Sequence, residues 1–219
     1  MTATLPFEII AETTHYIVVS KPAGLLVEHS PYYPSVEDFI RSYLIEKHPK
    51  KEPFVGIVHR LDRPVSGLLL VATRKSSLKA FNEQFSSRKV RKMYTAIVES
   101  RPPQQKDTLK QWLMTDKAAK RSYILDDFKK GAVEVSLTYE LLKECGDHSL
   151  LKIELHTGKF HQIRAQLSSI GCPILGDHKY GSTIQFISEK IALHASTLEV
   201  NDPTSGERLA FYSPFPYIL

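Results

Sequence analysis

Cysteine is scarce in this chain, and its placement excludes two kinds of stabilised fold. The 219 residues contain two cysteines, Cys145 and Cys172, which stand apart and outside any CxxC pattern. A structural zinc site needs several ligands at close spacing, and a disulfide framework needs several paired cysteines. We therefore expect two unpaired thiols in a reducing compartment.

Long hydrophobic runs are missing as well. No apolar stretch approaches the roughly 20 residues that a membrane-spanning helix requires. The first ten residues, MTATLPFEII, lack the basic start and the long apolar core of a signal peptide. We expect a soluble, cytoplasmic protein that does not use a membrane as a partner.

Several widespread catalytic and binding motifs are absent from the sequence. It contains no GxGxxG, no GxxxxGK[ST], no HExxH and no GxSxG. The first two patterns form dinucleotide- and phosphate-binding loops, HExxH forms a zinc protease site, and GxSxG forms a hydrolase nucleophile turn. These absences argue against each of the corresponding enzyme classes.

The chain is moderately basic and has enough apolar residues to fold. Its net charge is +5, its pI is about 9.1, and 42% of its residues are hydrophobic. This apolar content supports a sizeable core and argues against disorder. The length fits one domain, residues 1–219. The positive charge is compatible with an anionic partner, but it does not identify nucleic acid by itself.

Most of the chain has the pattern of strands joined by short turns, with three helices among them. Helices are predicted at 35–48, with Ser35 as N-cap, and at 76–87, with Ser76 as N-cap. Residues 156–167 lead into a third predicted helix, which has Phe160 on its apolar side and ends near residue 171. Residues 115–131 are charged and are expected to form an exposed, inserted loop. Strands are predicted at 7–10, 16–19, 25–27, 54–58, 68–72, 90–98, 109–114, 122–125, 132–142, 150–155, 191–200 and 207–212. This order predicts an α+β fold with a mixed, largely antiparallel β-sheet core and flanking helices.

One segment, residues 58–72, concentrates charge between two apolar runs. His59, Arg60, Asp62 and Arg63 stand between the predicted strands 54–58 and 68–72. Because burying an unpaired charge is costly, this group must lie at a sheet end or in a cleft. The two flanking arginines favour the ionised form of the aspartate. We expect an ionised carboxylate, held by guanidinium groups, at the mouth of a sheet.

An ionised Asp62 has several possible uses. It could be a nucleophile, a general base, a metal ligand or the partner of an arginine in a structural ion pair. No second carboxylate stands at an offset that suits a metal site or the paired acids of a glycosidase. The residues alone leave a plain ion pair, a catalytic carboxylate and a nucleoside or sugar hydrolase open.

Basic and aromatic residues elsewhere in the chain fit a contact with RNA. Arg88, Arg91 and Lys92 precede Tyr94, and strand alternation places Lys92 and Tyr94 on one face. Basic side chains beside an aromatic ring can hold RNA backbone and stack bases, although a tyrosine in a strand is usually a packing residue.

Two further basic residues stand at the edges of predicted elements. Lys21 precedes a Pro-Gly loop, where it is either a solvated turn residue or a phosphate contact. Arg164 lies at the border of the apolar stripe of the third helix, which comprises Phe160, Ile163, Leu167 and Ile170. An arginine at such a border can be held by packing and still point into a cleft.

The central segment and five others resemble one known family. His59-Arg60-Leu61-Asp62 followed by Ser66-Gly67-Leu68-Leu69-Leu70 resembles the signature of the RluA-type pseudouridine synthases, which isomerise uridine in RNA. The other matching segments, in family order, are VVSKPAG (18–24), KMYTAIV (92–98), TGKFHQIR (157–164), PILGD (173–177) and LHA (193–195). The resemblance extends from about residue 8 to residue 212. It implies the pseudouridine synthase fold and a reaction that needs no cofactor.

The resemblance also implies roles for individual residues. Asp62 would be the catalytic aspartate, Tyr94 would pack against the target base, and Arg164 would pair with Asp62 and keep it ionised. Arg60 would help position the flipped-out nucleotide, since a base in a stack cannot reach a pocket. The residues that would hold backbone phosphates are Lys21, Arg63, Arg88, Arg91 and Lys92.

The implied partner is ribosomal or transfer RNA. A monomer is the default expectation for the oligomeric state, which the sequence does not indicate. The sequence departs from the family at four positions, where the family often has Arg, His, Thr and Asn: Lys159, Gln166, Val65 and Ser20. These departures do not touch the catalytic residues, but they prevent any transfer of a particular RNA target. No S4-type RNA-binding domain is expected before the catalytic one. A non-catalytic RNA-binding or RNA-chaperone module on the same fold is the alternative.

Overall fold

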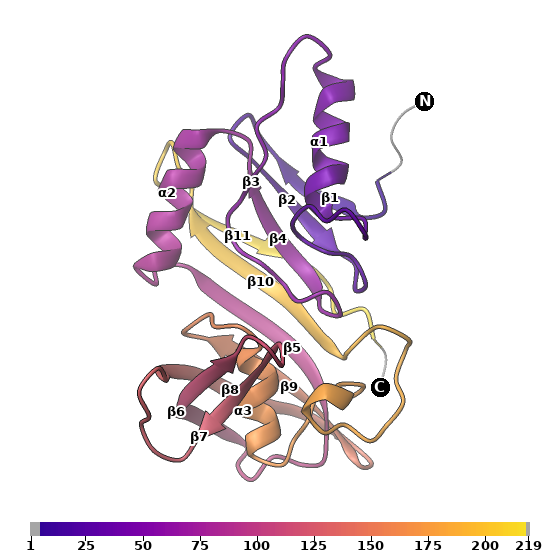
Figure 1. Cartoon of the computed structure of the whole chain (residues 1–219), viewed down its shortest axis with the longest axis vertical. Coiled ribbons are helices and arrows are strands. Elements are labelled where there is room, and N and C mark those ends of the chain that lie inside the picture. Colours follow the sequence, from indigo (N-terminus) through magenta and orange to yellow (C-terminus); the bar gives the residue numbers. More distant parts are fainter. Residues whose placement is uncertain (1–4, 218–219) are drawn as a thin grey trace. The chain divides into compact units, whose positions relative to one another are not determined.

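The structure is a computed structural model that describes residues 5–217, and its internal contacts divide them into two compact units. Unit 1 comprises residues 5–90 and 195–215, and unit 2 comprises residues 91–194 and 216–217. Within the described residues there are three α-helices, one short 3-10 helix and eleven strands (Figure 1). The α+β fold with a largely antiparallel sheet is confirmed. The single domain 1–219 remains a prediction.

The sheet of unit 1 is built around β4 (Ser66–Ala72), in which all seven residues are buried. β2 (Tyr16–Lys21) pairs antiparallel with β4 along its whole length, on one side of β4. β3 (Gly56–Ile57) and β10 (Leu193–Asn201) share the other edge. The outer strands are β1 (Glu8–Glu12), which pairs with β2, and β11 (Arg208–Tyr212), which pairs with β10.

Two predicted strands of this unit are largely absent. The strand predicted at 54–58 is reduced to the two residues of β3, which pair with Ala72 and Val71 at the last two positions of β4. Residues 54 and 55 fall beyond the end of β4 in this register, and β10 also pairs along this edge of β4. The strand predicted at 25–27 is only an isolated bridge between Leu26 and Ser35. β4, in contrast, begins at Ser66, two residues before the predicted start.

The two helices of unit 1 agree with prediction except at one cap. α1 (Val36–Lys47) begins after Ser35, whose Oγ accepts the N–H of Asp38 at 3.1 Å. α2 (Lys75–Ser86) begins before the predicted cap Ser76, because the Arg74 carbonyl already accepts the Leu78 N–H at 3.0 Å. Phe81 of α2 is fully buried in a cluster with residues of β2, β4 and β10.

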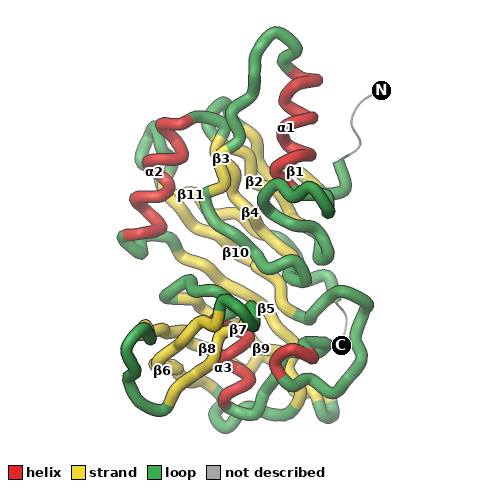
Figure 2. The backbone as a smooth tube through the Cα atoms, in the orientation of Figure 1, coloured by secondary structure: helices red, strands yellow, loops and turns green. Residues whose placement is uncertain are grey.

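Unit 2 is an antiparallel sheet with one α-helix, a short 3-10 helix and a long connecting loop (Figure 2). The strand predicted at 132–142 is present as β8, which buries Val135, Leu137 and Tyr139 and leaves the intervening residues less buried. The strands, in their order across the sheet, are β5 (Arg91–Glu99), β9 (His148–Leu155), β8 (Val133–Cys145), β6 (Lys106–Asp116) and β7 (Arg121–Leu125). β7 confirms the strand predicted at 122–125, and it pairs with β6, so residues 115–131 include one strand of a hairpin and do not form a single exposed loop.

The third helix is shorter and more deeply buried than its pattern predicts. α3 (Gln162–Ser169) begins after His161, which has a left-handed backbone with φ of 53°. Phe160, expected in the apolar stripe, precedes the helix and is 42% exposed. Residues 162–167 are all buried, because α3 packs against β6 and β7 and also contacts the short helix η1 (His178–Tyr180).

Cys145 and Cys172 are both free thiols, as expected. Among residues 5–217, no helix is long and apolar enough to cross a membrane.

Candidate active site

Asp62 lies in the connection that leads from β3 into β4. Its carbonyl accepts the N–H of Val65 at 3.0 Å, which closes a turn one residue before β4 begins. Gly67, the second residue of β4, has φ of 115° and lies against the backbone of Ala195, which leaves no space for a Cβ atom. The carboxylate therefore stands at the end of a buried strand, as the charge pattern predicted.

A loop from the end of β2 holds the Asp62 turn by its backbone. The Gly24 N–H donates to the Arg63 carbonyl at 2.7 Å, and Arg63 Nε donates to the Gly24 carbonyl at 3.1 Å. Gly24 has φ of 93°, a left-handed conformation that favours glycine. The Lys-Pro-Ala-Gly segment thus acts as a clamp on the residue that follows the aspartate.

Lys21 belongs to this clamp and not to an RNA-binding surface. Its side chain is completely buried, and Nζ donates to the carbonyls of Pro22 at 2.9 Å, Leu25 at 2.8 Å and Arg63 at 3.3 Å. Burial lowers the pKa of Lys21 from 10.5 to about 7, and the negative charge of Asp62 acts in the opposite direction. The predicted phosphate contact of Lys21 is therefore wrong, because packing removes its ammonium group from solvent.

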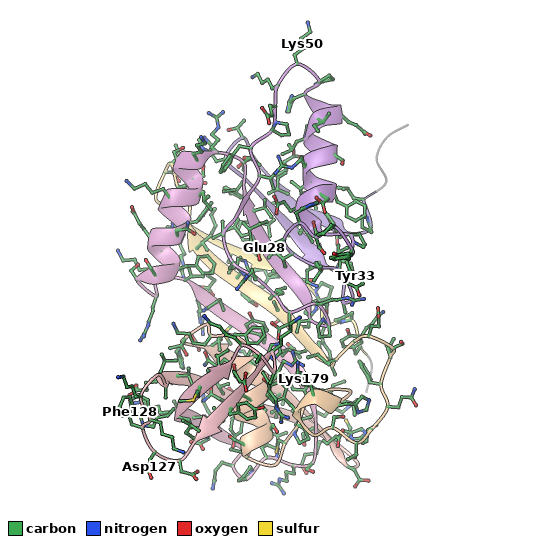
Figure 3. All side chains as sticks on the ribbon, in the orientation of Figure 1. Glu28, Tyr33, Lys50, Asp127, Phe128 and Lys179 are labelled. Carbon is green, nitrogen blue, oxygen red and sulfur yellow. The ribbon has the colours of Figure 1, made fainter. Side chains whose placement is uncertain are left out.

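The two arginines that flank Asp62 have different surroundings. Arg60 is exposed and pairs with the exposed Glu28, with 2.8 Å between Nη1 and Oε2. The Arg63 guanidinium stacks on the ring of Tyr33 at 4.5 Å from the ring centroid. Glu28 and Tyr33 both come from the segment that joins β2 to α1 (Figure 3). Both arginines that flank Asp62 thus contact the same connecting segment.

His59 supports the connection from the opposite side. The N–H of Leu70 in β4 donates to its Nε2 at 3.1 Å, and its ring stacks on Phe85 with 5.0 Å between centroids. A backbone N–H can only donate, so Nε2 is the acceptor in this contact. His59 therefore joins the Asp62 connection to β4 and α2.

In unit 2, Arg164 of α3 forms a buried, two-pronged ion pair with Asp177. Arg164 Nε lies 2.6 Å from Asp177 Oδ2, and Nη2 lies 2.8 Å from Oδ1. Their side chains are only 6% and 1% exposed. The guanidinium also stacks on the ring of Tyr180, 4.9 Å from its centroid. A planar arginine held on two sides in this way has a fixed orientation.

The loop that carries Asp177 is itself well anchored. The Asp177 carbonyl accepts N–H groups from Tyr180 at 2.8 Å and Ser182 at 3.1 Å. The Ser182 hydroxyl donates to Glu99 of β5, which also accepts the Ile184 N–H at 3.2 Å. These hydrogen bonds lower the pKa of Glu99, although burial opposes them. The carboxylate that orients Arg164 is thus tied to β5 of unit 2.

The two positions of α3 and its entry that depart from the family have separate environments. Gln166 is buried, and its amide donates to the Leu109 carbonyl at 3.2 Å and to Gln111 Oε1 at 3.0 Å. Lys159 is exposed, and its N–H donates to Gln162 Oε1 at 3.1 Å. Gln166 therefore acts in packing, whereas the Lys159 side chain faces solvent.

The remaining predicted residues lie on or next to β5. Tyr94 is buried on β5, opposite Ile153 of β9. Arg91 is exposed and pairs with Glu154, with 2.9 Å between Nε and Oε1. Arg88 is exposed directly after α2, where its φ is 58°, and Lys92 is half-buried close to Gly158. Asp62 belongs to unit 1, and Tyr94 and Arg164 to unit 2, so the pairing of Asp62 with Arg164 stays a prediction.

Sequence reasoning assigned no role to Asp177, which is the structural partner of Arg164. The signal was present, because Asp177 ends the segment PILGD that matches the family. Within residues 5–217, no group of three or more His, Cys, Asp or Glu side chains has an arrangement that could hold a metal ion.

Comparisons with known proteins agree with the motif pattern. A family model described as RNA pseudouridylate synthase matches residues 15–169. An uncharacterised RNA pseudouridine synthase of Chloroflexus aurantiacus is 34% identical over 203 residues, which cover 90% of this chain and 62% of that protein. A ribosomal large subunit pseudouridine synthase D of Borreliella burgdorferi is 32% identical over 224 residues, covering 98% and 67%. The chain spans between 62% and 72% of the length of the relatives from Chloroflexus, Chlorobaculum and Synechocystis.

The fold is also shared with solved structures. The human RNA pseudouridylate synthase domain containing 4 superposes with a TM-score of 0.79 at 23% identity, covering 95% of this chain and 88% of that one. The human domain containing 1 gives a TM-score of 0.75 at 22% identity, covering 97% and 84%. From its motifs, the family match and these relatives, the chain belongs to the RNA pseudouridylate synthase family, in its RluA-type branch.

Proposed function

We propose that this chain is an RNA pseudouridine synthase, an isomerase that converts specific uridines of a structured RNA to pseudouridine with Asp62 as its catalytic carboxylate. The observation that carries the proposal is the position of Asp62 in the turn just before the buried strand β4 begins. There its turn is clamped by the Lys21–Leu25 loop, inside the family match. A rigid backbone on both sides is what a carboxylate needs if it is to be aimed at one bond of a substrate.

The reaction conserves every atom of the nucleotide. The N1–C1′ bond breaks, the uracil turns within the site, and a C5–C1′ bond forms. C5 then loses its proton, and N1 is protonated. Asp62 either attacks C1′ or abstracts a sugar proton while the glycosidic bond breaks. The target uridine must first leave its stack, and an unpaired or loop nucleotide does so at the lowest cost.

The other residues take supporting roles in this proposal. Tyr94 packs against the base, and Arg164 keeps Asp62 ionised. Arg60 positions the flipped nucleotide, and Arg63, Arg88, Arg91 and Lys92 contact the RNA. The buried pair of Arg164 with Asp177 supports such a role, because it orients the guanidinium before any substrate binds. The protein is proposed to act as a monomer in the cytoplasm.

Ribosomal RNA is the first substrate to test. Relatives from Borreliella burgdorferi, Zymomonas mobilis and Pseudomonas aeruginosa carry the name ribosomal large subunit pseudouridine synthase D. Transfer RNA is the alternative substrate. Pseudouridine maps of ribosomal and transfer RNA, from cells with and without the gene, distinguish the two.

The decisive experiment compares the protein with its Asp62→Asn variant. Purified protein is incubated with RNA from cells that lack the gene, and pseudouridine is mapped at each uridine. We expect one or a few uridines to gain the modification, and none with Asp62→Asn. If no uridine is modified by the unaltered protein, the proposal fails. If Asp62→Asn corrects the growth defect of cells that lack the gene but does not restore the modification, a non-catalytic RNA-chaperone role is favoured instead.

A further inference from the structure

The segment between β2 and α1 presents two exposed tyrosines whose position packing does not explain. Tyr32 is 84% exposed and Tyr33 is 50% exposed. Both are large aromatic side chains whose burial would stabilise the fold, yet the folded chain leaves them at its surface. Tyr33 is visible on this connecting segment in Figure 3.

The ring of Tyr33 has one supported face. The Arg63 guanidinium lies 4.5 Å from the ring centroid. Arg63 is in turn anchored, because its Nε donates to the Gly24 carbonyl at 3.1 Å and its own carbonyl accepts the Gly24 N–H at 2.7 Å. A cation held against one face of an aromatic ring restricts the ring and leaves the opposite face for another planar group.

The backbone on either side of the tyrosines is also restrained. Pro31 and Pro34 flank the pair, and each fixes its own φ. The Pro34 carbonyl accepts the Leu26 N–H at 3.3 Å, and the next residue, Ser35, caps α1. The entropy lost when a ligand stacks on Tyr33 is therefore lower than for a tyrosine in an unrestrained loop.

The ring of Tyr33 is linked through Arg63 to the proposed catalytic residue Asp62. Arg63 directly follows Asp62 in the chain, so the cation beneath Tyr33 is one residue from the proposed catalytic carboxylate. Arg60, on the other side of Asp62, contacts the same connecting segment through Glu28. A nucleotide next to the target uridine is the planar, anionic group that would reach such a place.

We infer that Tyr33, supported by Arg63, is a stacking surface for an unpaired base that neighbours the target uridine, and that Tyr32 extends this surface. The inference rests on the proposed function, because it names the RNA that this site accepts. In a duplex, both faces of a base are covered by its neighbours. The substrate must therefore offer an unpaired nucleotide beside the uridine, as a loop or a single strand does.

The test uses a short RNA of uridines that carries one 2-aminopurine next to the central uridine. Stacking on an aromatic ring quenches 2-aminopurine fluorescence. The Asp62→Asn protein binds this probe without turnover, and Tyr33→Phe or Tyr33→Leu is added to it. We expect quenching and unchanged affinity with Tyr33→Phe, which keeps the ring. With Tyr33→Leu we expect loss of quenching and an affinity lower by roughly five- to a hundredfold.

Tyr212→Leu is the matched control, because Tyr212 is another exposed tyrosine of unit 1, with 66% of its surface exposed. It should change neither quenching nor affinity. Quenching that persists in Tyr33→Leu with unchanged affinity would overturn the inference, and so would an equal loss in Tyr212→Leu. Unchanged thermal unfolding of Tyr33→Leu shows that any loss comes from the ring and not from misfolding.

A kinetic measurement separates this inference from the proposed function. Once a modified uridine is mapped, Tyr33→Leu should raise KM and leave kcat nearly unchanged, since stacking on a neighbouring base is the same before and during the reaction. If pseudouridine forms but Tyr33→Leu changes neither KM nor quenching, the stacking inference fails and the function stands. If no RNA is modified but quenching depends on Tyr33, the function fails and the stacking surface stands.

Discussion

Replacing the buried Lys21 by methionine should change how the stability of the protein depends on pH. Lys21 is completely buried, and its pKa falls from 10.5 to about 7 in the folded chain. Between these two values, the unfolded chain holds a proton that the folded chain has released. Unfolding then takes up a proton, so the free energy of unfolding rises with pH across this window.

The size of this effect follows from the two pKa values. Each pKa unit corresponds to about 1.4 kcal/mol, so the shift from 10.5 to about 7 amounts to something on the order of 5 kcal/mol. The contribution of the Lys21 titration to the free energy of unfolding is fully present above pH 10.5 and is lost as the pH falls through about 7. A measurement from about pH 7 to about pH 9 samples roughly 3 kcal/mol of it.

The assay is urea unfolding of the unaltered protein and of Lys21→Met at several pH values. Methionine has a similar length and no charge, so the difference between the two proteins isolates the titration of Lys21 from that of other groups. Lys21→Met leaves the carbonyls of Pro22, Leu25 and Arg63 without this donor, so it is destabilising, and increasingly so as the pH rises. The exposed Lys50→Met is the control and should show no such trend.

The reasoning is refuted if the stabilities of the unaltered protein and Lys21→Met change in parallel between pH 7 and 9. Parallel curves would mean that the ammonium stays charged in the folded protein, stabilised by its three carbonyl partners. Asp62→Asn provides a second check, because the charge of Asp62 opposes the lowering of the Lys21 pKa. Removing that charge should move the rise in stability to lower pH.

Three further predictions concern other contacts. Asp177→Asn removes the buried carboxylate that pairs with Arg164 and should destabilise the fold by about 3–5 kcal/mol in urea unfolding. Glu199→Gln, which breaks the more exposed pair with Arg208, should cost at most about 1 kcal/mol, and equal costs of the two variants would contradict this. Glu28→Gln releases Arg60 from its ion pair and should raise affinity for single-stranded RNA about two- to fivefold at low salt in a fluorescence titration, with unchanged affinity arguing against a role for Arg60. Gly67→Ala forces a Cβ against the Ala195 backbone at a φ of 115° and should lower the free energy of unfolding by more than about 2 kcal/mol, whereas the open Gly131→Ala should cost less.

The helices and the longer strands could be predicted because their signals are local. Ser35 and the first-turn acids mark the start of α1, and alternation from Val133 to Leu141 marks β8. Failures occurred where another part of the chain decided the outcome. Residues 54–58 form only the short β3 because β4 ends opposite Gly56 and β10 also pairs along that edge of β4. Residues before Gln162 stay outside α3 because His161 adopts a left-handed backbone.

In the candidate site, too, the features with local signals could be predicted and those set by distant residues could not. The cluster around Asp62 and its place at the end of a strand followed from charge lying between two apolar runs. The burial and the partners of the neighbouring basic residues could not be predicted from this pattern, because they depend on groups distant in sequence. Lys21 looked like a phosphate ligand and is instead enclosed by three carbonyls, whereas Arg63 has the ring of Tyr33 against it.

The sequence by itself determined the α+β pattern, the position of Asp62 at the head of a buried strand and the ordered motifs that identify the family. These depend on the periodicity of neighbouring residues and on residue identity, which the chain carries before it folds. Only the tertiary structure decided that Lys21 is buried, that Asp177 holds Arg164 and that Gly67 meets Ala195. Those features arise because folding brings distant residues into contact and removes water from some of them but not from others.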